Sequence, residues 1–182
     1  EKTYKMFADR LNSIMSIKTK MHDFLQSSHN RAEKPTALVS FYKSLKPSKK
    51  VKKLILDIPP DTLGLHLRLQ DHLQMQSEKY YLDRVQKIHK DLGYPKVFIC
   101  GDTQYKKNEL VNLFSDDKLI VNYTNLSNLI KVGQESVDRD SLGGMQLAVA
   151  EMFTLAKCTW IVPNSISSFS MSSFFMGKAQ LL

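Results

Sequence analysis

Cysteine is scarce in this chain of 182 residues, where only Cys100 and Cys158 occur. Two cysteines are too few for the bridges that hold disulfide-rich domains together, and these two do not form a C-x-x-C pair. We therefore expect two buried free thiols in apolar strands. The five histidines are scattered along the chain, so the sequence also lacks the ligand spacing of a zinc site.

Long apolar runs are absent as well. No stretch reaches the roughly 18 apolar residues that a membrane-spanning helix needs, so we expect no membrane span. The first ten residues, EKTYKMFADR, do not contain the apolar core of a signal peptide.

Glycine-rich phosphate motifs are missing too. The chain has only seven glycines, and none of them forms the GxGxxG fingerprint of dinucleotide enzymes or the GxxxxGK[ST] of P-loop proteins. The GxSxG elbow of α/β-hydrolases is also absent. These absences argue against an NAD enzyme, a P-loop NTPase and a serine hydrolase.

Acidic residues are scarce in the first third of the chain. Residues 1–60 hold 13 Lys or Arg against 5 Asp or Glu, whereas residues 61–182 hold 13 of each, so the whole net charge of +8 lies N-terminal. The densest run, KSLKPSKKVKK at residues 43–53, lacks the aromatic and Arg residues that stack on bases. We expect no nucleic-acid partner, and two interpretations of the run remain: a solvated face or a surface for an acidic partner.

Helical patterns fill the N-terminal part. Apolar residues recur at steps of three and four through residues 3–26, which predicts an amphipathic helix. Two shorter helices are predicted over residues 36–45 and 48–58, the second capped by Ser48 and ended by Pro59 and Pro60. Residues 1–58 are thus predicted to be a basic helical segment.

Strands and helices alternate from residue 59 onward. Strands are predicted over residues 62–68, 96–100, 118–121 and 158–163, and helices over residues 77–93, 107–114, 141–157 and 167–178. The strands are almost continuously apolar, which indicates a mostly parallel sheet covered on both faces. We therefore predict an α/β, Rossmann-like three-layer domain over residues 59–182.

Polar residues follow the predicted strands where such sheets bind ligands, outside the strand carboxyl ends. His66 and Arg68 close the first strand, Asp102 follows the second, and Asn164 follows the fourth. The convergence of these four positions predicts a binding site at this edge.

Three segments carry a family resemblance. They are GLHLRLQD, KVFICGDTQYKKNELVNLF and AEMFTLAKCTWIVPNSISSFS. In this order and at this spacing they resemble the nucleotide-binding half of the GT-B fucosyltransferase superfamily, and most of all the protein O-fucosyltransferases. The resemblance implies a GDP-fucose donor, inversion at the sugar, and no cofactor or metal.

The same resemblance assigns roles at the first strand. Arg68 is the catalytic candidate, because a guanidinium can place two N–H donors on the β-phosphate as negative charge develops there. Arg68 could instead form a salt bridge with Asp71. His66 is a donor-binding candidate for ribose or phosphate, or else a core histidine. Asp71 fits best as a residue that orients Arg68 or its loop.

Further donor-binding candidates lie in the third segment. Asn164 follows the last strand, and Ser167 and Ser168 begin a helix whose N–H groups could bind phosphate, although a serine there is also an ordinary N-cap. Phe169 matches an aromatic position of the family and either packs beside the nucleotide or in the core. Glu151 stands where the family has a guanine-binding Asp, and its alternative is a surface acid.

Two alternatives to this interpretation stay open. Asp138 and Asp140 form a D-x-D pattern of the kind that holds a metal in other glycosyltransferases, although Asp140 could equally cap a helix. Alternatively, the chain is a non-catalytic module that keeps the fold and binds a partner through its basic face.

The resemblance also sets expectations about the surroundings. The basic segment cannot supply the first Rossmann-like half of a GT-B enzyme, so we expect a donor-binding half with a protein or glycan hydroxyl as acceptor. The triplets NYT and NLS, at Asn122 and Asn125, are glycosylation acceptors. They fit the lumen of the secretory pathway.

Overall fold

The computed structural model describes residues 36–67, 78–101, 110, 112–114, 120–121, 141–163 and 167–182. Contacts divide the chain into two compact units, Glu1–Leu45 and Lys46–Leu182. Of the first unit, helix α2 (Thr36–Ser44) is described, close to the predicted 36–45. The predicted helix over residues 3–26 lies outside the described residues.

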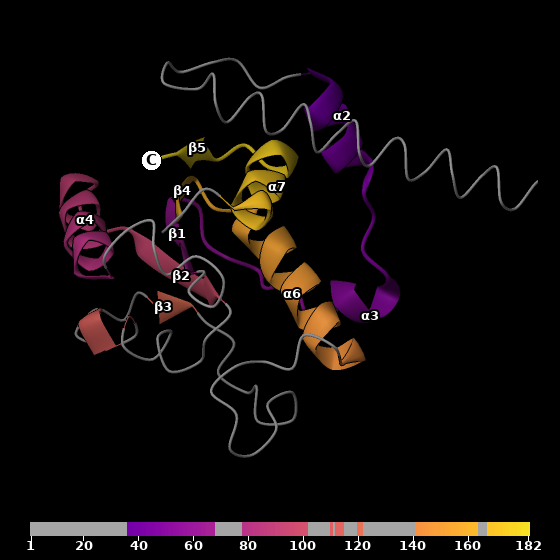
Figure 1. Cartoon of the computed structure of the whole chain (residues 1–182), viewed down its shortest axis with the longest axis horizontal. Coiled ribbons are helices and arrows are strands. Elements are labelled where there is room, and N and C mark those ends of the chain that lie inside the picture. Colours follow the sequence, from indigo (N-terminus) through magenta and orange to yellow (C-terminus); the bar gives the residue numbers. More distant parts are fainter. Residues whose placement is uncertain are drawn as a thin grey trace, which may run out of the picture. The chain divides into compact units, whose positions relative to one another are not determined.

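The second unit is built around a parallel sheet (Figure 1). Its strands are β1 (Thr62–Leu67), β2 (Lys96–Gly101), β3 (Ile120–Val121), β4 (Trp160–Pro163) and β5 (Gln180–Leu181). They lie in the order β3-β2-β1-β4-β5, and every neighbouring pair is parallel. The predicted parallel α/β sheet is therefore confirmed.

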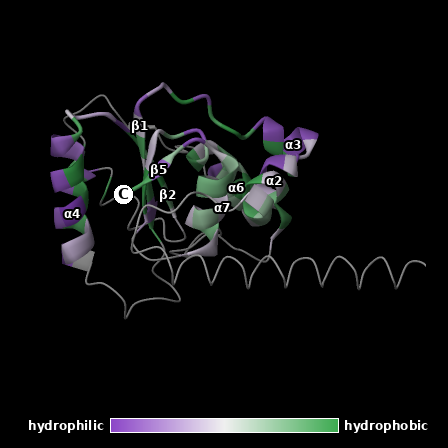
Figure 2. Cartoon of the chain, turned by 90° about the horizontal axis from the view of Figure 1, so that it is seen from above, coloured by the Kyte–Doolittle hydropathy of each residue, from purple (hydrophilic) through white to green (hydrophobic). Residues whose placement is uncertain are grey.

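Helices cover both faces of this sheet, which gives three layers. Helix α4 (Glu78–Asp91) lies on one side of the strands, and helices α6 (Leu142–Leu155) and α7 (Ser168–Met176) lie on the other (Figure 2). Helix α4 ends as predicted, with Gly93 in the left-handed conformation at φ 77°.

Alternation along β1 decides which side chains meet which helices. Leu63 and Leu65 are fully buried and belong to the core cluster that contains Tyr81 and Val85 of α4. The alternate residues point to the opposite face. There Gly64 lets α6 approach, since a Cβ at this position would collide with the side chain of Leu155, the last residue of α6, and would lie 2.9 Å from the Cys158 Sγ atom.

A buried hydroxyl joins α4 to the sheet. The Tyr81 hydroxyl donates a hydrogen bond of 3.0 Å to the carbonyl oxygen of Val162. Burial raises the pKa of Tyr81 far above its ordinary value, so the hydroxyl stays protonated and remains a donor.

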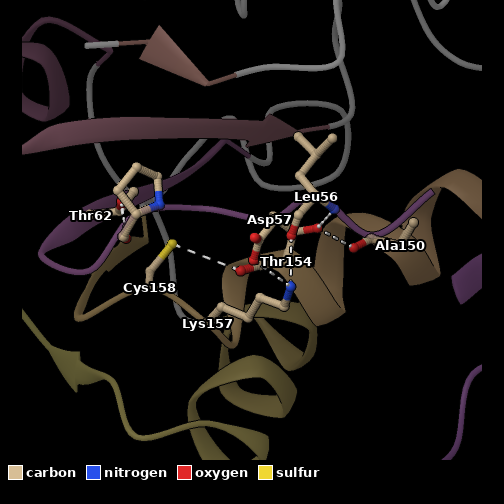
Figure 3. Close-up of polar contacts among 8 residues, drawn as sticks. Leu56, Asp57, Thr62, Ala150, Thr154, Lys157 and Cys158 are labelled. Atoms are coloured by element: carbon tan, nitrogen blue, oxygen red, sulfur yellow. Dashed lines mark hydrogen bonds and ion pairs between the residues drawn. The ribbon is translucent and has the colours of Figure 1, made fainter. Parts of the chain in front are cut away.

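The segment before the sheet differs from the prediction. Helix α3 spans only Lys49–Lys52, with Ser48 as its predicted N-cap, whereas the sequence pattern continues to residue 58. Leu54 and Ile55 N–H still bond back to Val51 O, but Leu56 bonds elsewhere. Its N–H donates to Thr154 Oγ1 of α6 at 3.1 Å, and its carbonyl oxygen accepts from Lys157 Nζ, just after α6, at 2.8 Å (Figure 3). Helix α3 belongs to the second compact unit.

The last strand was not predicted. β5 contains only two residues and pairs in parallel with β4. Its backbone bonds, such as Gln180 N–H to Thr159 O at 2.9 Å, depend on where β4 lies. A two-residue strand carries no periodicity of its own, so the sequence pattern could not indicate it.

Among the described helices, none is both long and apolar enough to cross a bilayer.

Replacing Thr154 by Val should destabilise the domain. The substitution keeps the side-chain volume but removes the acceptor of the part-buried Leu56 N–H. A donor left without a partner costs about 1–3 kcal/mol when it is buried, so we expect a loss of about 1 kcal/mol or more here. Urea unfolding followed by the fluorescence of Trp160, the only tryptophan, measures the loss.

Thr159→Val is the matched control. Its hydroxyl oxygen accepts from the exposed Asp61 N–H, which water can satisfy instead, so we expect a loss under about 1 kcal/mol. Equal losses in the two variants would contradict the role of Thr154.

Candidate functional site

The site lies where the order of the strands reverses. β1 is the central strand, and its neighbours are β2, which follows it through α4, and β4, which comes much later in the chain. The crevice outside the carboxyl ends at such a switch point is the usual ligand site of an open α/β sheet. Here the residues at that edge are His66 of β1 and its register partners, Cys100 of β2 and Pro163 of β4.

His66 connects this edge to the first turn of α7. Its ring is only 4% exposed, and its Nδ1 atom lies 2.6 Å from the hydroxyl oxygen of Ser170. The ring also stacks on Phe169, with centroids 4.6 Å apart and an angle of 16° between the planes. Two contacts therefore fix the orientation of the imidazole.

Ser167 is the N-cap of α7, as predicted. Its side chain accepts the N–H of Ser170 at 3.4 Å, and its own hydroxyl lies 3.5 Å from that of Ser170. The N–H groups of Ser168 and Phe169 come in the same first turn, where they have no intrahelical acceptor. Such a turn favours a phosphate or another anion.

The other two residues of this turn differ in exposure. Ser168 is exposed and Phe169 is half-buried. Phe169 packs on His66, a contact that is compatible with both of its expected roles, beside the nucleotide and in the core.

Four predicted site residues lie outside the described residues: Arg68, Asp71, Asp102 and Asn164. Arg68, Asp102 and Asn164 directly follow β1, β2 and β4 in the sequence. Asp138 and Asp140 of the D-x-D pattern also lie outside the described residues. Within the described ranges, no group of three His, Cys, Asp or Glu side chains could hold a metal ion.

Glu151 is not a surface acid. It lies in the middle of α6 and is 5% exposed, on a buried face that also contains Leu147, Ala150, Thr154 and Leu155. Burial of a carboxylate costs free energy unless the group is hydrogen-bonded or paired. The surface alternative is therefore wrong, and the guanine-binding alternative stays a prediction.

Both thiols are free and buried, as expected. The Cys100 Sγ atom donates to Leu65 O at 3.5 Å in the sheet. Burial raises the pKa of Cys158 to about 12, so this thiol is protonated and unreactive at neutral pH.

Ser170 was missed in the sequence. The sequence pattern indicates Ser167 and Ser168 as the start of the helix. A residue three positions after an N-cap is placed next to it by one helical turn, so the spacing from Ser167 could have drawn attention to Ser170. Its contact with a strand residue 104 positions earlier could not have been read from spacing.

No protein-family model and no curated protein matches this chain. Solved structures with a similar chain path include fucosyltransferases. Fucosyltransferase NodZ from Bradyrhizobium is 19% identical at a TM-score of 0.47, over 71% of this chain and 42% of that one.

Two further structures are similar. POFUT1 in complex with GDP-fucose is 14% identical at a TM-score of 0.49, over 81% of this chain and 48% of that one. NodZ α-1,6-fucosyltransferase co-crystallised with GDP is 20% identical at a TM-score of 0.43, over 64% of this chain and 36% of that one. The chain thus spans half or less of the length of these structures.

Proposed function

We propose that the sheet domain binds GDP-fucose at the carboxyl edge of β1 and β4, as the donor-binding half of a fucosyltransferase-like enzyme. The observation that carries the proposal is the junction of His66 with the first turn of α7. It brings two of the three family-like segments together at the switch point of the sheet.

The diphosphate is proposed to bind between the two elements. The N–H groups at the start of α7, which have no intrahelical acceptor, and the hydroxyl of exposed Ser168 suit phosphate oxygens. Arg68 directly follows the last residue of β1 and is proposed to bind the same oxygens through its guanidinium. Asn164, which follows β4, is proposed to contact the donor, and Asp71 to orient Arg68.

The base and the ribose have their own candidates. Buried Glu151 is proposed to accept the guanine N1–H and N2–H groups, a pattern that adenine does not offer. His66 is proposed to donate to a phosphate or ribose oxygen. Phe169, stacked on His66, forms the wall of the site beside the nucleotide.

The proposed reaction is an inverting transfer without metal. An acceptor hydroxyl on a protein or glycan attacks the anomeric carbon, its proton passes to a base, and the bond to the β-phosphate oxygen breaks to release GDP. Negative charge grows on that phosphate, where Arg68 and α7 stabilise it. We propose that a further Rossmann-like half supplies the base and the acceptor site, in the lumen of the secretory pathway.

Arg68→Ala should weaken GDP binding. Losing a charge-assisted hydrogen-bond pair costs about 1.5–3 kcal/mol, which corresponds to roughly 10–100-fold in Kd. Isothermal titration of the full chain with GDP measures the effect. The same titration with ADP tests the role of Glu151, which should favour guanine over adenine.

Lys87→Ala is the matched control, since it removes one positive charge from an exposed site on α4. It should leave the Kd unchanged. A folded wild-type chain that takes up no GDP would refute the donor-binding proposal.

Metal should not be needed for donor binding. The titration with GDP-fucose should give the same Kd in EDTA as in excess Mn²⁺, because the cationic and N–H groups proposed here neutralise the diphosphate. A large gain of affinity with Mn²⁺ that Asp138→Asn and Asp140→Asn abolish would instead support the D-x-D alternative.

The basic region supports a second candidate function, a non-catalytic interaction module. Five lysines on and beside α3 are exposed: Lys46, Lys49, Lys50, Lys52 and Lys53. Val51 is buried and anchors the helix. The nearest acidic residue in the sequence, Asp57, pairs with Lys157 at 3.7 Å and not with one of these lysines.

Neutralising Lys49, Lys50, Lys52 and Lys53 to Gln should abolish binding to immobilised polyglutamate, and the wild-type interaction should weaken as salt rises. The control carries the same charge change at four exposed positions elsewhere: Lys79, Lys87, Lys90 and Lys96. If both quadruple variants lose binding equally, net charge alone explains it and the α3 surface is not a specific site.

A further inference from the structure

Helix α6 carries an exposed apolar stripe. Leu142, Met145 and Val149 follow one another at steps of three and four residues, and their side chains are 65%, 51% and 36% exposed. The exposed face of a surface helix usually carries charged or polar residues. The charged residue of α6 is Glu151, which is buried. An exposed apolar patch of this kind is typical of a surface that binds a protein or a membrane.

The apolar stripe points away from the sheet. The opposite side of α6 is buried and faces β1, where the side chain of Leu155 reaches the space beside Gly64. Helix α3 lies against α6 on the outer side, away from the sheet (Figure 1 and Figure 2). The stripe and α3 are therefore on the same side of the domain.

Helix α3 adds positive charge to this side. The five lysines on and beside it are exposed, and residues 35–56 contain no acidic residue. In the described part of the chain, none of these lysines takes part in an ion pair. One side of the domain thus combines exposed apolar side chains with a cluster of ammonium groups, a combination found in helices that lie at a membrane interface.

We propose that this side of the domain binds the surface of an anionic lipid membrane. The lysines lie among the anionic headgroups, and the apolar stripe enters the boundary between headgroups and acyl chains. Because the stripe contains no charged or hydrogen-bonding side chain, its transfer out of water leaves no polar side chain without a partner. The inference goes beyond both proposed functions, and it shares the α3 lysines with the second of them.

Two other kinds of partner fit these residues less well. A protein partner would bury the lysines, whereas lysine is depleted in protein–protein interfaces. A nucleic acid is bound through Arg and aromatic side chains that stack on bases, and residues 43–53 contain neither. A lipid surface uses both the positive charge and the apolar stripe.

Co-flotation of the full chain with lipid vesicles tests the proposal. The chain should float with vesicles of phosphatidylcholine and phosphatidylserine in a two-to-one ratio, and the bound fraction should fall as salt rises. Vesicles of phosphatidylcholine alone should bind weakly, because they carry no net negative charge.

Neutralising the α3 lysines should lower binding to the mixed vesicles. The Gln variant at residues 49, 50, 52 and 53 should lose roughly 100-fold or more, because each lysine near an anionic surface contributes about fivefold. The Gln variant at residues 79, 87, 90 and 96 has the same net charge and should keep most of its binding. Equal losses in the two variants would contradict a role of α3.

The apolar stripe is tested by its own pair of variants. Leu142→Gln combined with Met145→Gln should lower vesicle binding roughly tenfold or more, because the two side chains no longer enter the apolar layer. The matched control replaces Tyr80 and Leu113 by Gln, since both are exposed apolar side chains outside α6, and its binding should be unchanged. Urea unfolding checks that each variant is folded.

A fluorescent label reports insertion directly. Both native thiols are buried, so the new thiol of Met145→Cys takes a nitrobenzoxadiazole label. With the mixed vesicles, its emission should rise and shift to the blue as the dye leaves water. The same label on Lys87→Cys of α4, on the other side of the sheet, should show no shift (Figure 2).

Failure to float with the mixed vesicles would overturn the inference, and so would a vesicle-bound Met145→Cys chain without a spectral shift. A dimer in lipid-free buffer that Leu142→Gln with Met145→Gln dissociates would assign the stripe to a second copy of the chain and would overturn it as well. Binding to polyglutamate without binding to vesicles would sink the lipid proposal and leave the basic surface as a site for an acidic protein. The GDP titration is independent of these outcomes.

Discussion

The contact between the end of β1 and the first turn of α7 is the interaction on which the candidate site depends. His66 and Ser170 are both buried, and their hydrogen bond fixes the separation of a strand end and a helix start that meet only through the fold. The first turn of α7 offers N–H groups of the kind that suit an anion. The contact holds this turn beside the His66 ring at the end of β1.

Helix α6 makes that contact possible by packing close to the sheet. Gly64 provides the space, since any side chain there would meet Leu155 and Cys158. At its C-terminal end α6 also binds the chain that leads into β1, through Thr154 and Lys157 (Figure 3). β1 is thus positioned from its entry by α6 and at its exit by α7. This is why a hydroxyl far from the site, that of Thr154, is expected to matter for stability.

The functional proposals differ in how much they draw on the described geometry. His66, Ser167, Ser168 and Phe169 were predicted from the sequence, and the structure brings them together at one edge of the sheet. Arg68 stays a prediction from its place in the chain. Glu151 is buried in α6, and guanine binding by its carboxylate stays a prediction.

The sequence by itself determined the local order of the domain: which segments are strands and helices, where Ser48 and Ser167 cap, and where Gly93 ends a helix. These features follow from periodicity and from hydrogen bonds within one turn, so neighbouring residues are enough to decide them. Only the tertiary structure decided the strand order, the early end of α3, the short β5 and the bond from Ser170 to His66. Each of these depends on backbone or side-chain partners about a hundred or more residues away or on a neighbouring strand, and no local pattern states which partner the fold will bring near.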